Sequence, residues 1–171
     1  NTAVTPTAAS GSSAVHGIRS SAVAAALTIT NNLVHGIQVS GTATAYNGIT
    51  NSGAVTGTIN LNNNQLGNID AGAVRFMFNN TGVVTGISNT GATATTTVNL
   101  NNNSIEGILA VSLTSNLTGI LSSANAGVAI NINNNNLGSA SADFNTYSAA
   151  TSNTIFGFFN SGGVAASTVI S

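Results

Sequence analysis

The chain has 171 residues, a net charge of −1 and no cysteine, and charged residues make up 3% of it. Because so few Lys and Arg residues are available to neutralise phosphates, the composition excludes classes that bind nucleic acid or anionic membranes. The lack of cysteine excludes disulfide scaffolds and thiolate metal sites. No apolar run approaches the ~20 residues that cross a bilayer. We expect one domain with no nucleic-acid partner, no membrane span and no cofactor.

Hydrophobic residues make up 42% of the chain, and it contains a single proline. Disordered chains are poorer in apolar residues, so this one should fold. Its Val, Ile and Thr content favours strands over helices. The near absence of charge leaves little repulsion between copies, so we also expect self-association.

Residues 1–12 match no other part of the chain and are interpreted as an extended N-terminal arm. Residues 13–171 are interpreted as one solenoid domain. The chain begins with Asn1 rather than Met, which fits removal of a signal peptide or a trimmed chain; we favour secretion, with an extracellular or cell-surface location.

A motif of apolar-x-Gly-Ile begins at Val15-His16-Gly17-Ile18. It predicts a short strand segment beside a turn at each occurrence. The further copies lie at 34–37, 46–49, 84–87, 105–108 and 117–120.

Four Asn-rich segments set the period of the chain. Their apolar centres, Ile29, Leu61, Leu100 and Ile132, are 32, 39 and 32 residues apart. A larger period of 71 residues relates approximately 28–98 to 99–169, as a tandem duplication would. One turn of a solenoid needs several short strands, and this spacing fits it. The sequence therefore predicts an all-β, single-stranded parallel β-helix of about four coils that alternate between 32 and 39 residues.

The Asn runs are expected at the bends between strands, because Asn tolerates left-handed backbone and bonds locally. Stacked coils would place equal amides above one another as hydrogen-bonded ladders. The residues expected in this ladder are Asn31, Asn32, Asn62, Asn63, Asn64, Asn101, Asn102, Asn103, Asn133, Asn134 and Asn135.

The pattern apolar-x-Asn-Asn-x-apolar-x-Gly-Ile at 29–37 and 100–108 resembles the repeat of right-handed parallel β-helix proteins. That class includes bacterial adhesins, autotransporter passenger domains and polysaccharide lyases. The resemblance covers nearly all of the chain and implies the architecture and a right-handed coil. It does not select among adhesion, lysis and scaffolding.

No capping element is visible at either end of the predicted solenoid, although isolated solenoids usually carry one. Residues 164–171 match 93–100 at the period of 71, so the last strand would begin a fifth coil. We expect copies to stack head to tail, with the arm added as a further strand. The expected contact residues are Val4, Val15, Ile18, Val164, Val169 and Ile170.

The charged residues are too dispersed for the acid–base chemistry of a lyase or hydrolase, so no catalytic residue is assigned. Asp70 and Asp143 could approach each other in adjacent coils, but isolated loop charges are the expected role. Arg75 and Glu106 are expected as surface charges or a weak ion pair.

His16 and His35 share a Val-His-Gly-Ile motif and could stack in neighbouring coils as a metal pair or pH switch. Outward-facing polar positions are the expected role, and no metal site is assigned. The aromatic patches are expected to pack in the core, with a lateral contact between filaments as the alternative. They comprise Phe76, Met77, Phe78, Phe144, Phe156, Phe158 and Phe159.

Three segments fit the N-glycosylation pattern, at Asn79, Asn102 and Asn116, and the Thr-rich stretch 93–97 could carry O-linked sugar. In a chain this rich in Asn and Thr, such matches arise by chance.

We expect a structural subunit of an extracellular bacterial filament, surface fibre or biofilm matrix, with itself as partner and other surface or matrix components as further candidates. One alternative is a stalk fragment of a large adhesin. A second is an ice-binding solenoid, which would carry regular Thr-x-Thr rows at every coil; only 42–44, 56–58 and 95–97 come near to such rows, and they do not recur at the period of 71. A polysaccharide lyase is the third, and the scarcity of charge argues against it.

Overall fold

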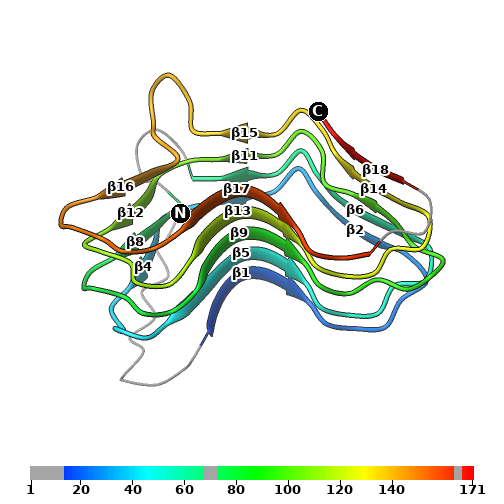
Figure 1. Cartoon of the computed structure of the whole chain (residues 1–171), viewed down its shortest axis with the longest axis horizontal. Helices are drawn as coiled ribbons and strands as arrows, with labels where there is room; N and C mark the ends of the chain where they lie inside the picture. The colour runs from blue at the N-terminus through cyan, green and yellow to red at the C-terminus, as the bar shows by residue number, and fades with distance from the viewer. Residues whose placement is uncertain (1–13, 68–72, 164–166) are drawn as a thin grey trace.

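The computed structural model describes residues 14–67, 73–163 and 167–171. Its regular structure is all β, and every strand pair is parallel. In each coil the chain contributes strands to four sheets in turn and then returns to the first sheet, so successive coils stack on one another (Figure 1). The prediction of a parallel β-solenoid of about four coils is confirmed. Within the described part of the chain, no helix is both long and apolar enough to cross a membrane.

Within the described residues, sheets 1 and 2 each contain five strands, and sheets 3 and 4 each contain four. Sheet 1 is built from β1 (Ala14–Ser20), β5 (Ala45–Asn51), β9 (Val84–Asn89), β13 (Leu117–Ser122) and β17 (Ile155–Asn160). Sheet 2 is built from β2 (Leu27–Thr30), β6 (Thr58–Asn62), β10 (Thr97–Asn99), β14 (Ala129–Ile132) and β18 (Ser167–Ile170). Sheet 3 is built from β3 (Leu33–Val34), β7 (Gln65–Leu66), β11 (Ser104–Ile105) and β15 (Asn136–Leu137). Sheet 4 is built from β4 (Ile37–Val39), β8 (Val74–Phe76), β12 (Ile108–Ala110) and β16 (Asn145–Tyr147).

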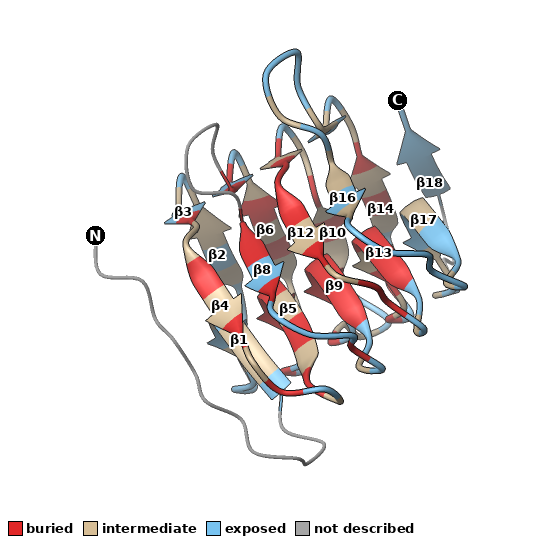
Figure 2. Ribbon diagram, turned by 90° about the vertical axis from the view of Figure 1, so that its left-hand side faces the viewer, coloured by how far each residue is buried: buried red, intermediate tan, exposed pale blue. Residues whose placement is uncertain are grey.

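Identical or similar apolar residues stack above one another inside the coils. Ile49, Ile87 and Ile120 form one such column in sheet 1, and each is fully buried. In sheet 2, Leu61 and Leu100 are likewise fully buried. Two strands of the middle coils in sheet 1, β9 and β13, are buried along nearly their whole length, as Figure 2 shows. The repeated sequence therefore builds one continuous core from end to end.

Sheet 1 bends at its centre, where a glycine lies in each strand (Figure 1). A Cβ atom on Gly48 would lie 2.1 Å from Leu66 Cδ2, and one on Gly86 would lie 2.8 Å from Ile105 Cδ1. Side chains of sheet 3 thus pack directly against the backbone of sheet 1, and only glycine leaves that space.

The apolar-x-Gly-Ile motif has two structural roles, which corrects the prediction of a turn at every copy. In sheet 1 its glycine lies within the strand, as Gly17 and Gly48 do. At 34–37 and 105–108 its glycine lies between sheets 3 and 4, where Gly36 and Gly107 have φ of 71° and 70°. Only the second group marks a corner.

The two coil lengths arise mainly between sheets 3 and 4. β3 and β11 are followed almost at once by β4 and β12, whereas seven residues separate β7 from β8 and β15 from β16. This loop therefore accounts for five of the seven residues by which the coils of 39 residues exceed those of 32, and the strands of all four sheets stay paired across it.

The last strand departs by one residue from the period of 71. β18 pairs with β14 so that Ile170 lies beside Ile132 and Val169 beside Asn131. The period would have placed Val169 in the inward column of Val98. Because side chains alternate between faces, this shift turns Val169 outward and Ile170 inward.

Candidate functional site: the Asn ladders and the open ends

An inward-facing Asn ladder runs through the corner between sheets 2 and 3. The Nδ2 of Asn32 donates to Asn64 Oδ1 at 3.0 Å, that of Asn64 to Asn103 Oδ1 at 3.1 Å, and that of Asn103 to Asn135 Oδ1 at 3.0 Å. Each acceptor oxygen also receives the backbone N–H of the same donor residue, at 3.1, 3.0 and 2.9 Å. Asn64 and Asn103 are buried, so the ladder satisfies amides that would otherwise be costly to desolvate.

The predicted ladder residues divide into three classes of position. Those preceding the inner ladder, Asn31, Asn63, Asn102 and Asn134, have φ between 54° and 59° and turn the corner with exposed side chains. The residues one position earlier, Asn62, Asn101 and Asn133, are half-buried on the outer surface. The backbone N–H of Asn101 donates to Asn62 Oδ1 at 2.8 Å, and that of Asn133 donates to Asn101 Oδ1 at 2.9 Å. Stacked Asn hydrogen bonding is thus confirmed, but the amide-to-amide bonds belong to the inner column.

A short outer ladder, absent from the predicted set, lies on sheet 2. Asn99 Nδ2 donates to Asn60 Oδ1 at 2.9 Å, and Asn131 Nδ2 donates to Asn99 Oδ1 at 2.8 Å. These residues lie outside the Asn triplets, which is why attention to the triplets missed them.

A second inner column, also missed, occupies the corner between sheets 1 and 2. It contains Ser20, Asn51, Asn89, Ser122 and Asn160 in successive coils. Asn51 Nδ2 donates to Asn89 Oδ1 at 2.9 Å. Among the described residues, Asn89 Nδ2 and Ser122 Oγ find no partner. The sequence contains one weak signal for this column, since the tripeptide Asn-Ser/Thr-Gly occurs at 51–53, 89–91 and 160–162.

The C-terminal end of the solenoid exposes its own core. Ile155, Phe158 and Ile170 continue inward columns whose members in the middle coils are 0 to 1% exposed, yet they are 45, 38 and 53% exposed. In Figure 2, β17 and β18 on the right are coloured as exposed or intermediate, whereas strands of the earlier coils such as β9 and β13 are coloured as buried. β17 and β18 pair on one side only, so their other edges carry free backbone groups within the described structure.

The N-terminal end of the solenoid presents the first members of the same apolar columns. β1 and β2 also pair on one side only. Val15 and Ile18 of β1 and Leu27 and Ile29 of β2 are partly buried and pack on the core. The predicted contact residues that the structure describes therefore lie at the two ends; Val4 and Val164 fall outside the described residues.

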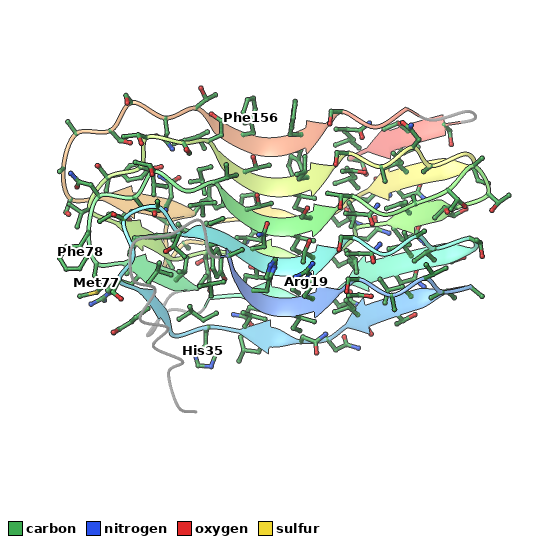
Figure 3. The ribbon with its side chains drawn as sticks, turned by 90° about the horizontal axis from the view of Figure 1, so that it is seen from below. Arg19, His35, Met77, Phe78 and Phe156 are labelled. Atoms are coloured by element: carbon green, nitrogen blue, oxygen red, sulfur yellow. The ribbon has the colours of Figure 1, made fainter. Side chains whose placement is uncertain are left out.

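The outer face of sheet 1 carries different side chains at its two ends. The bend brings Phe156 and Phe159 together, with ring centroids 4.9 Å apart. At the other end, the equivalent positions hold His16 and Arg19. Figure 3 shows Arg19 and Phe156 at opposite ends of the solenoid. Burial, with a smaller contribution from the Arg19 charge, lowers the pKa of His16 below its usual value.

The two histidines do not stack in neighbouring coils. His16 lies in β1, and His35 follows β3 in the same coil. This corrects the alternative of a histidine pair across coils. No cluster of three or more His, Cys, Asp or Glu residues that could hold a metal occurs in the described ranges.

Glu106 is not the surface charge that the sequence suggested, because it is 6% exposed in the corner between β11 and β12. Arg75 is exposed as expected. Asp143 is exposed in the loop before β16, and Asp70 falls outside the described residues.

The aromatic residues do not share one role. Phe76 is buried and meets the ring of Tyr46 edge-on, with centroids 6.3 Å apart. Phe144 is half-buried against the core. Met77 and Phe78 are exposed on the outer surface, so core packing is wrong for these two (Figure 3). The three glycosylation candidates, Asn79, Asn102 and Asn116, are all exposed.

Within the described strands of sheet 2, threonine forms no continuous row on the outer face. Thr58 and Thr97 are neighbours, but Ala129 continues their column in the next coil.

No protein-family model, no curated protein and no solved structure matches this chain.

Proposed function

We propose that this chain is a non-enzymatic structural subunit of an extracellular filament or surface fibre, and that its copies stack head to tail through the two open ends. The single observation that carries the proposal is the continuity of the core columns. Ile155, Phe158 and Ile170 are core residues by position, and they are exposed because no strand of the described residues lies beyond β17 and β18. Covering three half-exposed side chains of this size contributes about 1 kcal/mol each.

The ends are complementary in register. Continuing sheet 1 from β17 of one copy into β1 of the next stacks Val15 on Ile155 and Ile18 on Phe158. In sheet 2 the same continuation stacks Ile29 on Ile170. Apolar residues meet apolar residues, and the free strand edges gain backbone partners.

The outer face of sheet 1 adds a specific contact at this junction. The same register stacks Arg19 of one copy above Phe159 of the other, and His16 above Phe156. A guanidinium at a strand spacing of about 4.8 Å from an aromatic face is attracted to it by about 0.5–1 kcal/mol. This pairing favours contact between the N-terminal end of one copy and the C-terminal end of the next. Contact between two C-terminal ends would instead bring two Phe156–Phe159 pairs together.

Head-to-tail contacts of this kind do not close, so they produce fibres. The described residues of each copy contribute five strands to sheet 1. At about 4.8 Å per strand, the rise per subunit is about 24 Å. Electron microscopy of the concentrated protein should show unbranched fibres with this repeat.

The test compares two Phe→Asp variants. Phe158→Asp puts a charge into the junction and should raise the critical concentration for fibre formation by about 100-fold or more, since an unpaired buried charge costs about 3 kcal/mol. Phe78→Asp makes the same change on the outer surface and should leave it unchanged. Light scattering measures both. A wild-type chain that stays monomeric at millimolar concentration contradicts the proposal, as does equal assembly of the two variants.

A further inference from the structure

The outer face of sheet 4 carries a hollow that spans coil 2 (β5–β8), coil 3 (β9–β12) and coil 4 (β13–β16). Its volume is about 370 Å³, and it lies across β8, β12 and β16, whose sheet faces the viewer in Figure 2. Its lining side chains form two columns, one in the strands and one two residues further along each coil: Arg75, Leu109 and Thr146, and then Met77, Val111 and Ser148. These six side chains define the sheet-4 hollow.

The middle of the sheet-4 hollow is apolar and its two ends are polar. Leu109 and Val111 of coil 3 are half-buried, and Met77 of coil 2 is 44% exposed on the side of the solenoid (Figure 3). The guanidinium of Arg75 lies at the coil-2 end. Coil 4 contributes two hydroxyl side chains at the other end, two strand spacings or about 10 Å away. Exposed apolar surface with such a polar rim is typical of a binding site.

Stacking of the coils does not require these side chains. At the period of 71 residues, Arg75 corresponds to Thr146, and Leu109 corresponds to Gln38. All four face outward at the same place in sheet 4, and their strands pair in one register whichever side chain is present. Along the described strands of sheet 4, an arginine beside a run of apolar outward residues occurs in this one place. The sheet-4 hollow is therefore not a by-product of the repeat.

The charge of Arg75 is available to a ligand. Arg75 is exposed, and it makes no ion pair with another described residue. The side-chain carboxylates of the described residues belong to Glu106 and Asp143, which precede β12 and β16 rather than lie on the outer face of those strands. The planar guanidinium donates two parallel hydrogen bonds to one carboxylate, whereas a doubly charged phosphate needs further donors. The charge complement of the sheet-4 hollow is thus a single carboxylate.

We propose that the sheet-4 hollow binds an amphiphilic carboxylic acid, with the carboxylate on Arg75 and the alkyl chain across Leu109 and Val111 toward coil 4. Ligand sites have volumes of about 300–1,000 Å³, so this one suits a small, single-chain acid. The residues involved lie on the side of the solenoid and away from its two ends. Binding is therefore a further property of the chain that does not depend on the fibre.

The chain provides its own reporter for this site. Met77 is the single methionine, so a chain labelled with ¹³C at the methionine methyl group gives one such NMR signal, and it arises from the sheet-4 hollow. Titrating sodium decanoate into the unassembled chain should shift this signal with half-saturation at about 1 mM, as a ligand of this size allows. Acetate, which has the charge without the chain, should leave the signal in place. Decanol, which has the chain without the charge, should bind about fivefold more weakly, since an exposed ion pair contributes little more than this.

Two substitutions locate the contact. Arg75→Gln should weaken decanoate binding about fivefold, to the level of decanol, and should leave decanol binding unchanged. Val111→Ser should weaken the binding of both ligands about threefold, because it removes apolar surface from the middle of the hollow. Val23→Ser is the matched control, since Val23 is 79% exposed and lies outside the hollow, and it should change neither affinity.

Each other result overturns the proposal. No saturable shift up to 10-fold above the expected half-saturation means that the hollow does not bind the acid. Decanol bound as tightly as decanoate, or full decanoate affinity in Arg75→Gln, means that Arg75 does not recognise the carboxylate. Equal losses in Val111→Ser and Val23→Ser place the binding elsewhere. A Met77 signal that moves with protein concentration before any ligand is added shows that a second copy covers the hollow instead.

Discussion

The two corners that flank sheet 2 solve the same problem in different ways. Both place a polar column inside the solenoid, where the chain turns from one sheet to the next. Between sheets 2 and 3 every described rung is Asn, and each amide bonds the next. Between sheets 1 and 2 the column mixes Asn with Ser, and only Asn51 bonds the next rung through its amide.

The difference follows from side-chain length. A stacked amide reaches both neighbours about 4.8 Å away because it carries a donor and an acceptor at its tip, whereas the serine hydroxyl is shorter and has one hydrogen. Asn89 therefore has a buried Nδ2 above Ser122 with no partner in the described structure. We therefore expect a ladder to stabilise a corner most where every rung is an amide. Four changes test this difference between the two corners.

The largest effect is expected from Asn103→Ala in the complete ladder. This change removes a buried rung and leaves the amide of Asn64 without its acceptor. We expect a loss of about 2–4 kcal/mol in the free energy of unfolding. Urea denaturation below the critical concentration measures it, and a loss under about 0.5 kcal/mol would show that the ladder does not stabilise the corner.

A smaller loss is expected from Asn102→Ala, one position earlier. Asn102 has φ of 56°, which alanine disfavours by about 1–2 kcal/mol, while its side chain is exposed. Asn102→Gly is the matched control and should be neutral within about 0.5 kcal/mol. Equal losses for the two variants would mean that the side chain, and not the backbone, matters here.

A gain in the free energy of unfolding is expected when an Asn is introduced into the incomplete column between sheets 1 and 2. In three coils the corner reads Asn-Ser/Thr-Gly, but in coil 4 it reads Ser122-Ser123-Ala124. The double change Ser122→Asn with Ala124→Gly gives this corner the Asn-Ser-Gly sequence found at 51–53 and supplies an acceptor for Asn89 Nδ2. We expect about 1 kcal/mol of added stability, measured as a raised denaturation midpoint. No gain, with an unchanged fold by circular dichroism, would argue against amide continuity as the cause.

The smallest effect is expected from Asn99→Ala on the outer face of sheet 2. Its amide bonds Asn60 and Asn131, but these groups are only partly buried and water can replace the bonds. A loss of about 0.5 kcal/mol or less is expected. A loss equal to that of Asn103→Ala would remove the distinction between inner and outer ladders.

The sequence predicted the complete corner and missed the incomplete one for a clear reason. Asn triplets at a fixed spacing are an unusual signal, and they point to a left-handed turn followed by a stacked amide. Asn51 and Asn89 stand alone in ordinary-looking segments, and their role depends on which residue lies beside them in the next coil. That information is a register, which local patterns do not contain.

Two further misinterpretations have the same origin. Gly17 and Gly36 share one motif, yet the first lies in a strand and the second in a corner. What separates them is the side chain packed against the glycine from another sheet. The one-residue shift at β18 was also missed, because Val169 and Ile170 are both apolar and the sequence alone could not decide which one faces inward.

The inner ladder also has a direction. Asn32, Asn64 and Asn103 all send their Nδ2 groups toward the following coil, so the amide dipoles of the column point the same way and add. A fibre made from such subunits would be polar, and its two tips would differ: one presents an amide oxygen at Asn32 and the other an N–H at Asn135. Subunits would then join the two tips at unequal rates, and an organism could control growth of the whole fibre by blocking a single tip.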